Sequence, residues 1–243
     1  MRTNKGGRYA MNIKNKTKRL HFDTLPSTQD YAKDRRADGV DLAVTATYQT
    51  GGKGTKGRSF SSQEGGVYLS KLSFYEDLHV KSAFKIMIGA AEAVCETLRF
   101  YGLKPLIKWP NDIWVNDKKI CGILIENVFA GDKVRSSVVG IGLNVSNRLP
   151  EELSEIATTM QLVIGETPTV EEVTCRLLEE LDKERTMEDY RAYVGYMGRE
   201  VTLLLNDERI PGRLLFVDDE GGLHVEVSGK PRRFTAAEVS VRI

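Results

Sequence analysis

The chain has 243 residues, 41% hydrophobic and 28% charged, so it can bury a sizeable core as one large domain or one domain with a small appendage. Its 35 Lys and Arg residues nearly balance its 34 Asp and Glu residues, which excludes a global field that would attract DNA or an anionic membrane. No secretory signal and no apolar run of about 18 residues occur, so neither secretion nor a membrane span is expected.

The cysteines indicate a reducing compartment. Cys95, Cys121 and Cys175 are an odd number, widely spaced and without a C-x-x-C pair, which argues against a disulfide framework or a zinc site. A cytoplasmic location is therefore expected. The first twenty residues carry seven Lys or Arg residues and no acid, and both a frayed basic terminus and an organelle-targeting segment fit them.

The first hundred residues alternate between strand and helix patterns. Ser27 or Thr28 can serve as the N-cap of a helix that Gly39 ends. Period-two and β-branched runs predict strands, and apolar residues at three- and four-residue steps predict a long helix ended by Gly102. The predicted elements are a strand over 18–23, a helix over 26–39, strands over 41–49 and 67–74, and a helix over 79–101.

Residues 105–145 are predicted to form β-sheet, because three apolar runs are separated by turn residues at Pro110-Asn111, Asn116-Asp117 and Gly131-Asp132. A helical period returns over 170–197. Residues 199–243 then form five short β patterns, divided by Asn206-Asp207, by 218–222 and by 229–231, which is typical of a small β-barrel.

These patterns predict an α+β fold: a mixed β-sheet with helices packed against it and a small barrel behind. The predicted domains are 1–197 and 198–243. A linker rich in glycine, serine or proline is absent, and so is an internal repeat.

The segment GGKGTKGRSF, residues 51–60, is glycine-rich and positively charged and follows one predicted strand and precedes another. Glycines allow backbone N–H groups to converge on an anion, and Lys53, Lys56 and Arg58 add charge, so a phosphate or carboxylate site is one interpretation. A solvated hairpin tip is the other. The P-loop pattern does not occur, and a dinucleotide-binding loop must open a helix rather than a strand.

The segment KWPNDIWVNDKKICGILIE, residues 108–126, predicts a hairpin with a polar tip. Pro110 interrupts a simple ladder, Asn111 offers donors and acceptors, Asp112 is a carboxylate near lysines, and Lys119 precedes a strand containing Gly122. Taken alone, this segment is better explained as an ordinary P-N-D turn beside a core tryptophan.

Several ordered motifs together resemble the biotin protein ligases, which activate biotin with ATP and attach it to a lysine of a carrier protein. The resemblance covers roughly residues 20–243 and implies the biotin and lipoate ligase fold, akin to class II synthetases, with an SH3-like C-terminal barrel. The motifs are S-T-Q at 27–29, Y-Q-T-G-G-K-G at 48–54, G-R-S-F at 57–60, K-W-P-N-D at 108–112, K-I-C-G-I-L-I-E at 119–126 and G-I-G-L-N-V at 140–145.

The resemblance implies roles for particular residues. The implied catalytic residues are Lys119, Lys53 and Arg58, around the activated carboxyl group and the phosphates, and Asp112 is the implied ligand of Mg²⁺. The implied biotin-binding residues are Ser27, Thr28, Gln49, Gly52, Lys53, Lys119 and Gly122. The implied nucleotide-binding residues are Arg58, Phe60, Lys108, Trp109, Asn111 and Asn144, with Phe60 at the position of an aromatic residue that stacks on adenine.

One position departs from the family. The glycine-rich loop of these enzymes carries an arginine where Thr55 stands, and Lys53 replaces another arginine. Because threonine offers no charged, forked donor set, we hypothesise that Lys56 partly substitutes and that the adenylate is held less tightly than in relatives with arginine.

The resemblance also implies partners: biotin, ATP with Mg²⁺, and the biotin carboxyl carrier domain of a carboxylase. Only about twenty residues precede the first matched strand, so the winged-helix DNA-binding domain of the repressor members, and hence binding to DNA, is not expected. An exposed sheet edge could pair across a two-fold axis, and both a monomer and a homodimer are compatible with the sequence.

Two other functions are compatible with parts of the sequence. A lipoate–protein ligase shares the fold and the adenylate chemistry, but the K-W-P-N-D and K-x-x-G-I-L-x-E motifs and the C-terminal barrel favour biotin. A non-catalytic ligase-like binding module is suggested only by Thr55.

Overall fold

The computed structural model describes residues 17–205, 208–236 and 240–242. The basic N-terminal segment 1–16 and the expected turn at Asn206-Asp207 therefore lie outside the described residues. Two sheets and five α-helices occur within the described part of the chain, which confirms the predicted α+β class.

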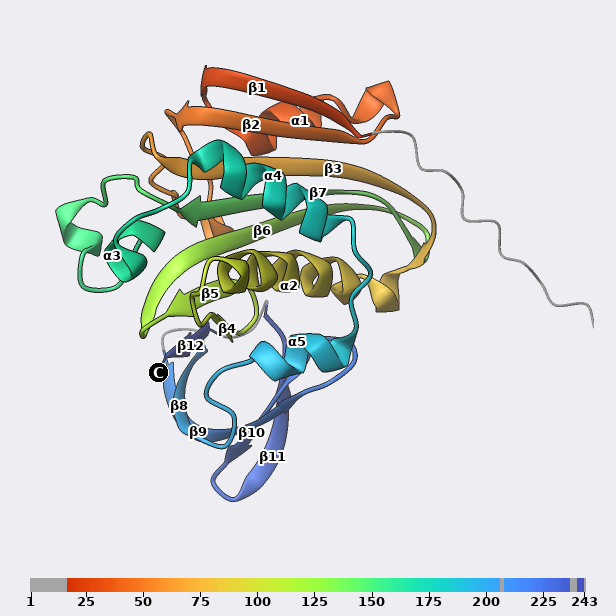
Figure 1. Ribbon diagram of the computed structural model, residues 1–243. Coiled ribbons are helices and arrows are strands. Elements are labelled where there is room, and N and C mark those ends of the chain that lie inside the picture. Colours follow the sequence, from red (N-terminus) through yellow and green to blue (C-terminus); the bar gives the residue numbers. More distant parts are fainter. Residues whose placement is uncertain (1–16, 206–207, 237–239, 243) are drawn as a thin grey trace, which may run out of the picture.

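The larger sheet is mixed and has seven strands in the order β1-β2-β3-β7-β6-β5-β4 (Figure 1). Only β1 and β2 run parallel to each other, and the other neighbours are antiparallel. The strands are β1 (Lys18–Leu25), β2 (Leu42–Gln49), β3 (Gly66–His79), β4 (Leu106–Lys108), β5 (Asp112–Val115), β6 (Lys118–Ala130) and β7 (Lys133–Asn144).

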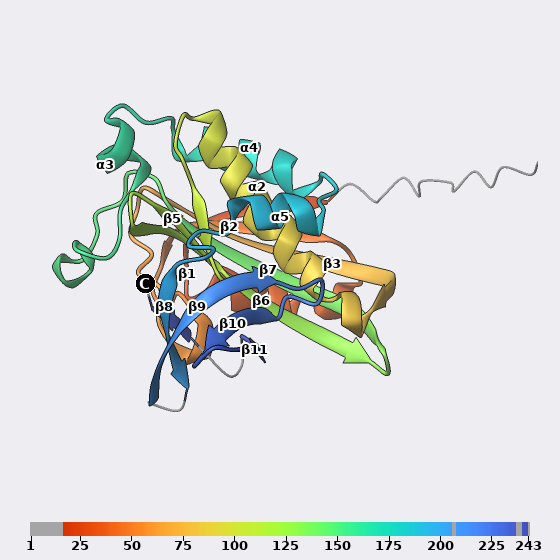
Figure 2. The same ribbon diagram turned by 90° about the horizontal axis from the view of Figure 1, so that it is seen from below.

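The helices cover the two faces of this sheet unequally. Helix α1 packs on β2, β3 and β7, while α2 packs on α4, α5 and strands β4 to β7. Figure 2 shows α2, α4 and α5 grouped on one side of the sheet. The helices are α1 (Thr28–Asp34), α2 (Phe84–Phe100), α3 (Met160–Ile164), α4 (Val170–Leu181) and α5 (Met187–Tyr193).

Strand alternation divides the buried residues between the two faces. The large core under α2 and α4 takes Val139, Ile141 and Leu143 from β7, whereas Val138 belongs to a small core that packs with Ala32 of α1. The positions that follow Val138 at two-residue steps therefore face the side of α1.

The C-terminal part is a five-stranded antiparallel sheet in the order β11-β10-β9-β8-β12, as the five short β patterns predicted. Gly198 has a positive φ of 75° and donates its N–H to the carbonyl of Leu214, just before the first of these strands. The division into 1–197 and 198–243 stays a prediction. The strands are β8 (Glu200–Leu205), β9 (Glu208–Val217), β10 (Leu223–Val227), β11 (Lys230–Phe234) and β12 (Ser240–Arg242).

Three predicted boundaries differ from the structure. The helix expected over 79–101 begins at Phe84, because the β3 ladder with β7 extends to His79. The helix expected over 170–197 is two helices, since Thr186 starts α5 with its own capping box. The helix expected over 26–39 is α1, capped by Ser27, followed by a short 3₁₀ turn that Gly39 ends at φ 68°.

The two sheets share one continuous core, and the K-W-P-N-D hairpin lies at their junction. The indole N–H of Trp109 donates to the carbonyl of Gly221 in the turn between β9 and β10, at 3.0 Å. A side chain at Gly221 would collide with the ring of Phe84, which packs edge-on against Tyr190. The Tyr190 hydroxyl donates to the carbonyl of Pro110 at 3.0 Å. The C-terminal sheet therefore holds this hairpin directly.

Candidate active site

A cavity of about 400 Å³ lies on the α1 face of the large sheet. Its wall combines the start of α1, the 51–60 loop, the strands β3, β6 and β7, and the segment 149–157. Most of the residues singled out in the sequence line it. They are Ser27, Thr28, Gln49, Lys53, Arg58, Phe60, Lys108, Asn111, Asp112, Lys119, Gly122 and Asn144.

Two of the singled-out residues do not line the cavity. The Trp109 side chain is 4% exposed and points to the C-terminal sheet, as described above. Gly52 lies behind the wall, where a side chain would come within 2.4 Å of the Phe60 carbonyl and of the Ser62 hydroxyl. Both residues shape the elements around the cavity.

Glycines on β6 and β7 form the floor of the cavity. Gly122 pairs with Gly142 across the two strands, and Gly140 follows on the same face. A Cβ at Gly142 would lie 2.6 Å from the Phe60 ring, and one at Gly140 would lie 2.5 Å from Oε1 of Gln29. The absence of side chains at these positions thus leaves room for the Phe60 ring and the Gln29 amide, which also line the cavity.

The wall beside α1 is polar and fully connected by hydrogen bonds. Oε1 of Gln49 accepts from the backbone N–H of Thr28 at 2.8 Å, and Nε2 of Gln49 donates to the Ser62 hydroxyl at 2.8 Å. These contacts fix the orientation of the Gln49 amide. The Thr28 hydroxyl lies 3.1 Å from Oε1 of Gln49 and 2.9 Å from the Ser70 hydroxyl. We name Thr28, Gln29, Gln49 and Ser70 the polar wall.

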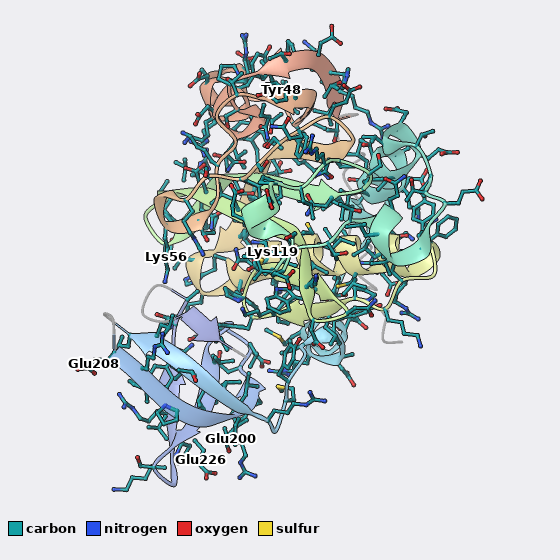
Figure 3. The ribbon with its side chains drawn as sticks, turned by 90° about the vertical axis from the view of Figure 1, so that its left-hand side faces the viewer. Tyr48, Lys56, Lys119, Glu200, Glu208 and Glu226 are labelled. Carbon is teal, nitrogen blue, oxygen red and sulfur yellow. The ribbon has the colours of Figure 1, made fainter. Side chains whose placement is uncertain are left out.

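A lysine and a carboxylate form the charged end of the cavity. Nζ of Lys119 lies 2.7 Å from Oδ1 of Asp112, and both side chains are partly exposed. The backbone of Lys119 is held on both sides by the segment that follows β7, since its N–H donates to the Ile156 carbonyl and its carbonyl accepts from the Thr158 N–H, each at 2.9 Å. The ammonium group therefore stands on a fixed backbone. Figure 3 shows Lys119 and Lys56 near the middle of the molecule, with Tyr48 above them and Glu200, Glu208 and Glu226 on the C-terminal sheet below.

The 51–60 loop is a small hairpin. The N–H of Gly54 donates to the Arg58 carbonyl, the N–H of Phe60 donates to the Gly52 carbonyl, and Lys53 forms a β-bridge with Ser59. The interpretation of a nest of converging N–H groups is wrong for these donors, because they are used inside the hairpin. The positive charge of the loop lies on its side chains.

The charges of this loop are held in different ways. Nζ of Lys53 lies 2.7 Å from the Asp30 carboxylate. Burial favours the neutral acid, but hydrogen bonds from Lys53 and Lys33 hold the pKa of Asp30 below its ordinary value. The Arg58 guanidinium folds back on Thr55, donating to its carbonyl at 3.1 Å and to its hydroxyl at 2.9 Å.

The two asparagines anchor neighbouring segments as well as lining the cavity. Nδ2 of Asn111 donates to the Ile123 carbonyl at 2.8 Å. The amide of Asn144 donates to the Thr158 carbonyl at 3.0 Å and accepts from Asn147 at 3.1 Å, and its side chain is buried. Each amide has more donor and acceptor sites than these contacts use.

The donor set fits a magnesium ion that arrives with a nucleotide. Asp112 is the one carboxylate among the described residues that line the cavity. No group of three or more His, Cys, Asp or Glu side chains in the described ranges is placed to hold a metal ion by itself. Magnesium binds through one or two carboxylates together with substrate phosphates, so a single aspartate is sufficient.

Sequence reasoning missed several cavity residues. Gln29 and Ser70 complete the polar wall, and Tyr68 and Trp114 also line the cavity. The alternation of residues 67–74 predicted a strand, and Ser70 lies on the face of this strand, β3, that lines the cavity. Segment 149–157, which contributes Leu153 and other residues, carried no motif.

Matches with known proteins agree with this architecture. Residues 21–144 match the Biotin/lipoate A/B protein ligase family, and residues 196–242 match the Biotin protein ligase C terminal domain. The chain is 32% identical to the Bifunctional ligase/repressor BirA of Bacillus subtilis, over 91% of this chain and 73% of that protein. It is 29% identical to the Biotin--[acetyl-CoA-carboxylase] ligase of Mycobacterium tuberculosis, over 84% and 82% of the two chains.

Solved structures show the same fold. The Biotin protein ligase from Aquifex aeolicus in complex with biotin and ATP superposes with a TM-score of 0.73 at 29% identity, covering 93% of this chain and 98% of that one. The chain belongs to the Biotin/lipoate A/B protein ligase family. It carries the C-terminal domain of the biotin protein ligases, and it is a ligase. Every helix in the described parts of the chain is too short or too polar to cross a bilayer.

Proposed function

We propose that this ligase activates biotin with ATP to biotinyl-5′-AMP and then transfers biotin to a lysine of a biotin carboxyl carrier domain. The observation that carries the proposal is one cavity in which a polar wall faces the pair Lys119 and Asp112. The relative from Aquifex aeolicus, similar over nearly the whole chain, was solved with biotin and ATP.

The polar wall suits the ureido ring of biotin. The Ser70 hydroxyl donates its hydrogen to Oε1 of Gln29, so it can only accept from Thr28, and Oε1 of Gln49 is also an acceptor. The lone pairs of the Thr28 hydroxyl are therefore available to the cavity. The Ser27 hydroxyl accepts the N–H of Asp30 as the N-cap of α1 and keeps its own hydrogen for donation. A donor beside acceptors complements a urea carbonyl flanked by N–H groups. The dithiolane ring of lipoate has no N–H group, which disfavours the lipoate alternative.

The charged end suits the first chemical step. The biotin carboxylate attacks the α-phosphorus of ATP, a P–O bond forms, and the P–O bond to pyrophosphate breaks. Because both reactants are anions, the protein assists by aligning them and offsetting the charge. Lys119 takes this role, with Lys53 and Arg58 approaching from the 51–60 loop. Asp112, together with the phosphates, would hold a magnesium ion, which would neutralise charge on the nucleotide.

The nucleotide lies beside the floor and the K-W-P-N-D hairpin. Phe60, whose ring covers Gly122 and Gly142, offers a face for adenine, and the amides of Asn111 and Asn144 offer polar contacts. Lys108 lines the same side, with its ammonium 4.2 Å from the centre of the Trp114 ring. Trp109 contributes indirectly, by fixing this hairpin to the C-terminal sheet.

In the second step, the neutral amine of the acceptor lysine attacks the carbonyl carbon of the mixed anhydride. A C–N bond forms, the C–O bond to AMP breaks, and the proton leaves the nitrogen to solvent. No histidine lines the cavity within the described residues, so none is assigned as the base.

Exchange of labelled pyrophosphate into ATP tests the proposal. Exchange that requires biotin supports it, and exchange that occurs only with lipoate supports the lipoate alternative. No exchange with either acid supports a non-catalytic binding module. Transfer to a purified carrier domain, read by streptavidin binding, then tests the second step.

A further inference from the structure

Glu126, the last residue of the K-I-C-G-I-L-I-E motif, lies outside the cavity wall but is linked to it. Its Oε2 accepts a hydrogen bond from Nε2 of Gln29 at 2.8 Å, and its Oε1 accepts from Nζ of Lys33 at 3.0 Å. Burial favours the neutral acid, but hydrogen bonds from Gln29 and Lys33 hold the pKa of Glu126 below its ordinary value. At neutral pH this side chain is a carboxylate that can only accept.

The carboxylate determines which way the Gln29 amide faces. Nε2 of Gln29 also donates to the Val138 carbonyl at 3.2 Å, so both of its hydrogens meet obligate acceptors. Oε1 of Gln29 is thereby turned toward Ser70, whose hydroxyl donates to it at 3.1 Å. The missing side chain of Gly140 leaves the space that this oxygen occupies.

The orientation continues along the polar wall. Because the hydrogen of Ser70 is committed to Gln29, the oxygen of Ser70 can only accept from Thr28. The other oxygen next to the Thr28 hydroxyl is Oε1 of Gln49, which is also an acceptor. Every hydroxyl hydrogen of the wall is thus directed at protein, and the wall presents acceptors to the cavity.

We propose that Glu126 is a positioning residue that sets the hydrogen-bond polarity of the ureido end of the cavity through the side-chain amide of Gln29. The inference rests on the proposed function for the identity of the ligand. The carboxylate does not contact the ligand. Its effect is to keep a wall of acceptors opposite ligand N–H groups, and a buried mismatch of donors at this place is costly.

The substitution Glu126→Gln tests the proposal, because Lys33 determines how the new side-chain amide is oriented. The ammonium of Lys33 can only donate, so it retains the carbonyl oxygen of the new side chain and turns the new NH₂ group toward Gln29. Gln29 must then rotate, which places its own NH₂ group against Ser70 and its oxygen against the Val138 carbonyl. The wall acquires a donor where the ligand also donates.

A second substitution separates polarity from structural damage. In Lys33→Met/Glu126→Gln the new amide is free to turn its oxygen toward Gln29, which restores the original orientation. Lys33→Met alone leaves the carboxylate in place and serves as the matched control. We expect the dissociation constant for biotin to rise at least about tenfold in Glu126→Gln, to stay within about twofold in Lys33→Met, and to return to within about threefold in the double variant.

Calorimetry of the full chain with biotin measures these constants, and binding of magnesium ATP is expected to stay unchanged in all three variants. Unchanged biotin binding in Glu126→Gln would overturn the proposal. A double variant that binds biotin as weakly as Glu126→Gln, or more weakly, would also overturn it. Structural damage from two substitutions would add up, whereas the proposal expects the second substitution to restore the original hydrogen-bond polarity.

A readout without ligand keeps this proposal distinct from the proposed function. The side-chain ¹H–¹⁵N signals of Gln29, assigned by their loss in Gln29→Ala, are expected to move in Glu126→Gln and to return in the double variant. Signals that stay in place in Glu126→Gln contradict the role of Glu126 whatever the ligand is. Absence of biotin binding by the unmodified chain instead rejects the proposed function.

Discussion

The two faces of the seven-stranded sheet are built by alternate residues of the same strands, yet they bury different chemistry. On the face under α2 and α4, Ile141 and Leu143 are at most 2% exposed and belong to the main core. On the face under α1, the intervening positions are Gly140 and Gly142, and the volume above them is the cavity. The first face supplies most of the hydrophobic stabilisation, and the second combines a smaller core with the cavity.

The polar wall and a buried acid on the opposite face differ in how their polar groups are paired. On the cavity face, the amides of Gln29 and Gln49 and the hydroxyls of Thr28 and Ser70 all have protein partners. On the other face, Glu92 of α2 is 1% exposed, and its Oε1 has no partner in the described part of the chain. Burial, with Asp189 nearby, raises the pKa of Glu92 to about 8. Paired groups confer specificity at little cost, whereas an unpaired acid costs stability.

The largest effect is expected at the charged end of the cavity face. Lys119→Met removes the ammonium group next to Asp112, so biotin-dependent pyrophosphate exchange should fall about 10³-fold, as for loss of a central charge-stabilising group. Biotin affinity should fall much less, because the polar wall is untouched. The matched control is Lys118→Met, whose ammonium donates to the Ser154 carbonyl on the surface and should leave exchange unchanged. Equal losses in both variants would contradict the role assigned to Lys119.

The next effect concerns the opposite face and its stability. The raised pKa of Glu92 means that the folded state binds a proton more tightly than the unfolded chain, so stability is greatest at low pH and is lost as pH rises toward 8. Relative to Glu92→Gln, the unmodified chain should lose about 3 kcal/mol of unfolding free energy between pH 5 and pH 8. Urea unfolding of both proteins at the two pH values measures the difference. A parallel pH dependence in both would show that Glu92 does not titrate in this range.

A smaller effect is expected at the glycine floor. In Gly140→Ala the new Cβ would lie 2.5 Å from Oε1 of Gln29, so the amide must shift and the polar wall with it. We expect biotin affinity to fall about tenfold. Gly89→Ala, on α2 with nothing within 4 Å of its Cβ, is the matched control and should leave affinity unchanged. A tolerated alanine at position 140 would mean that the floor does not need to be open there.

The comparison of faces also shows how far the sequence alone could lead. Alternation and turn residues predicted the strands, because burial on one face and the turn at Asn116-Asp117, where both φ angles are positive, are local signals. The break between α4 and α5 was missed because the helical period continues across it, although the capping box at Thr186 marks the second start. A capping interaction can thus outweigh periodicity.

The sequence predicted only those residues of the site that belong to recognisable motifs. The contact between Gln29 and Glu126 joins residues 97 positions apart, and no local pattern encodes such a distance. Trp109 belongs to a motif that lies at the cavity, yet its indole is used to hold the C-terminal sheet. Residues within one motif therefore separate into those that face the ligand and those that hold the motif in place, and only the fold distinguishes them.

The smallest effect is expected at Thr55, which lies in the 51–60 loop and lines the cavity. Here the Thr55 hydroxyl and carbonyl hold the Arg58 guanidinium against the loop. Thr55→Arg removes the hydroxyl acceptor, leaves Arg58 only its bond to the backbone carbonyl of residue 55, and adds a second forked cation, so release of the adenylate should slow about three- to tenfold. Thr55→Val removes the hydroxyl without adding charge and separates the two causes. Trapping of released biotinyl-AMP measures the rate, and an unchanged rate in Thr55→Arg would show that the charge at this position does not hold the adenylate.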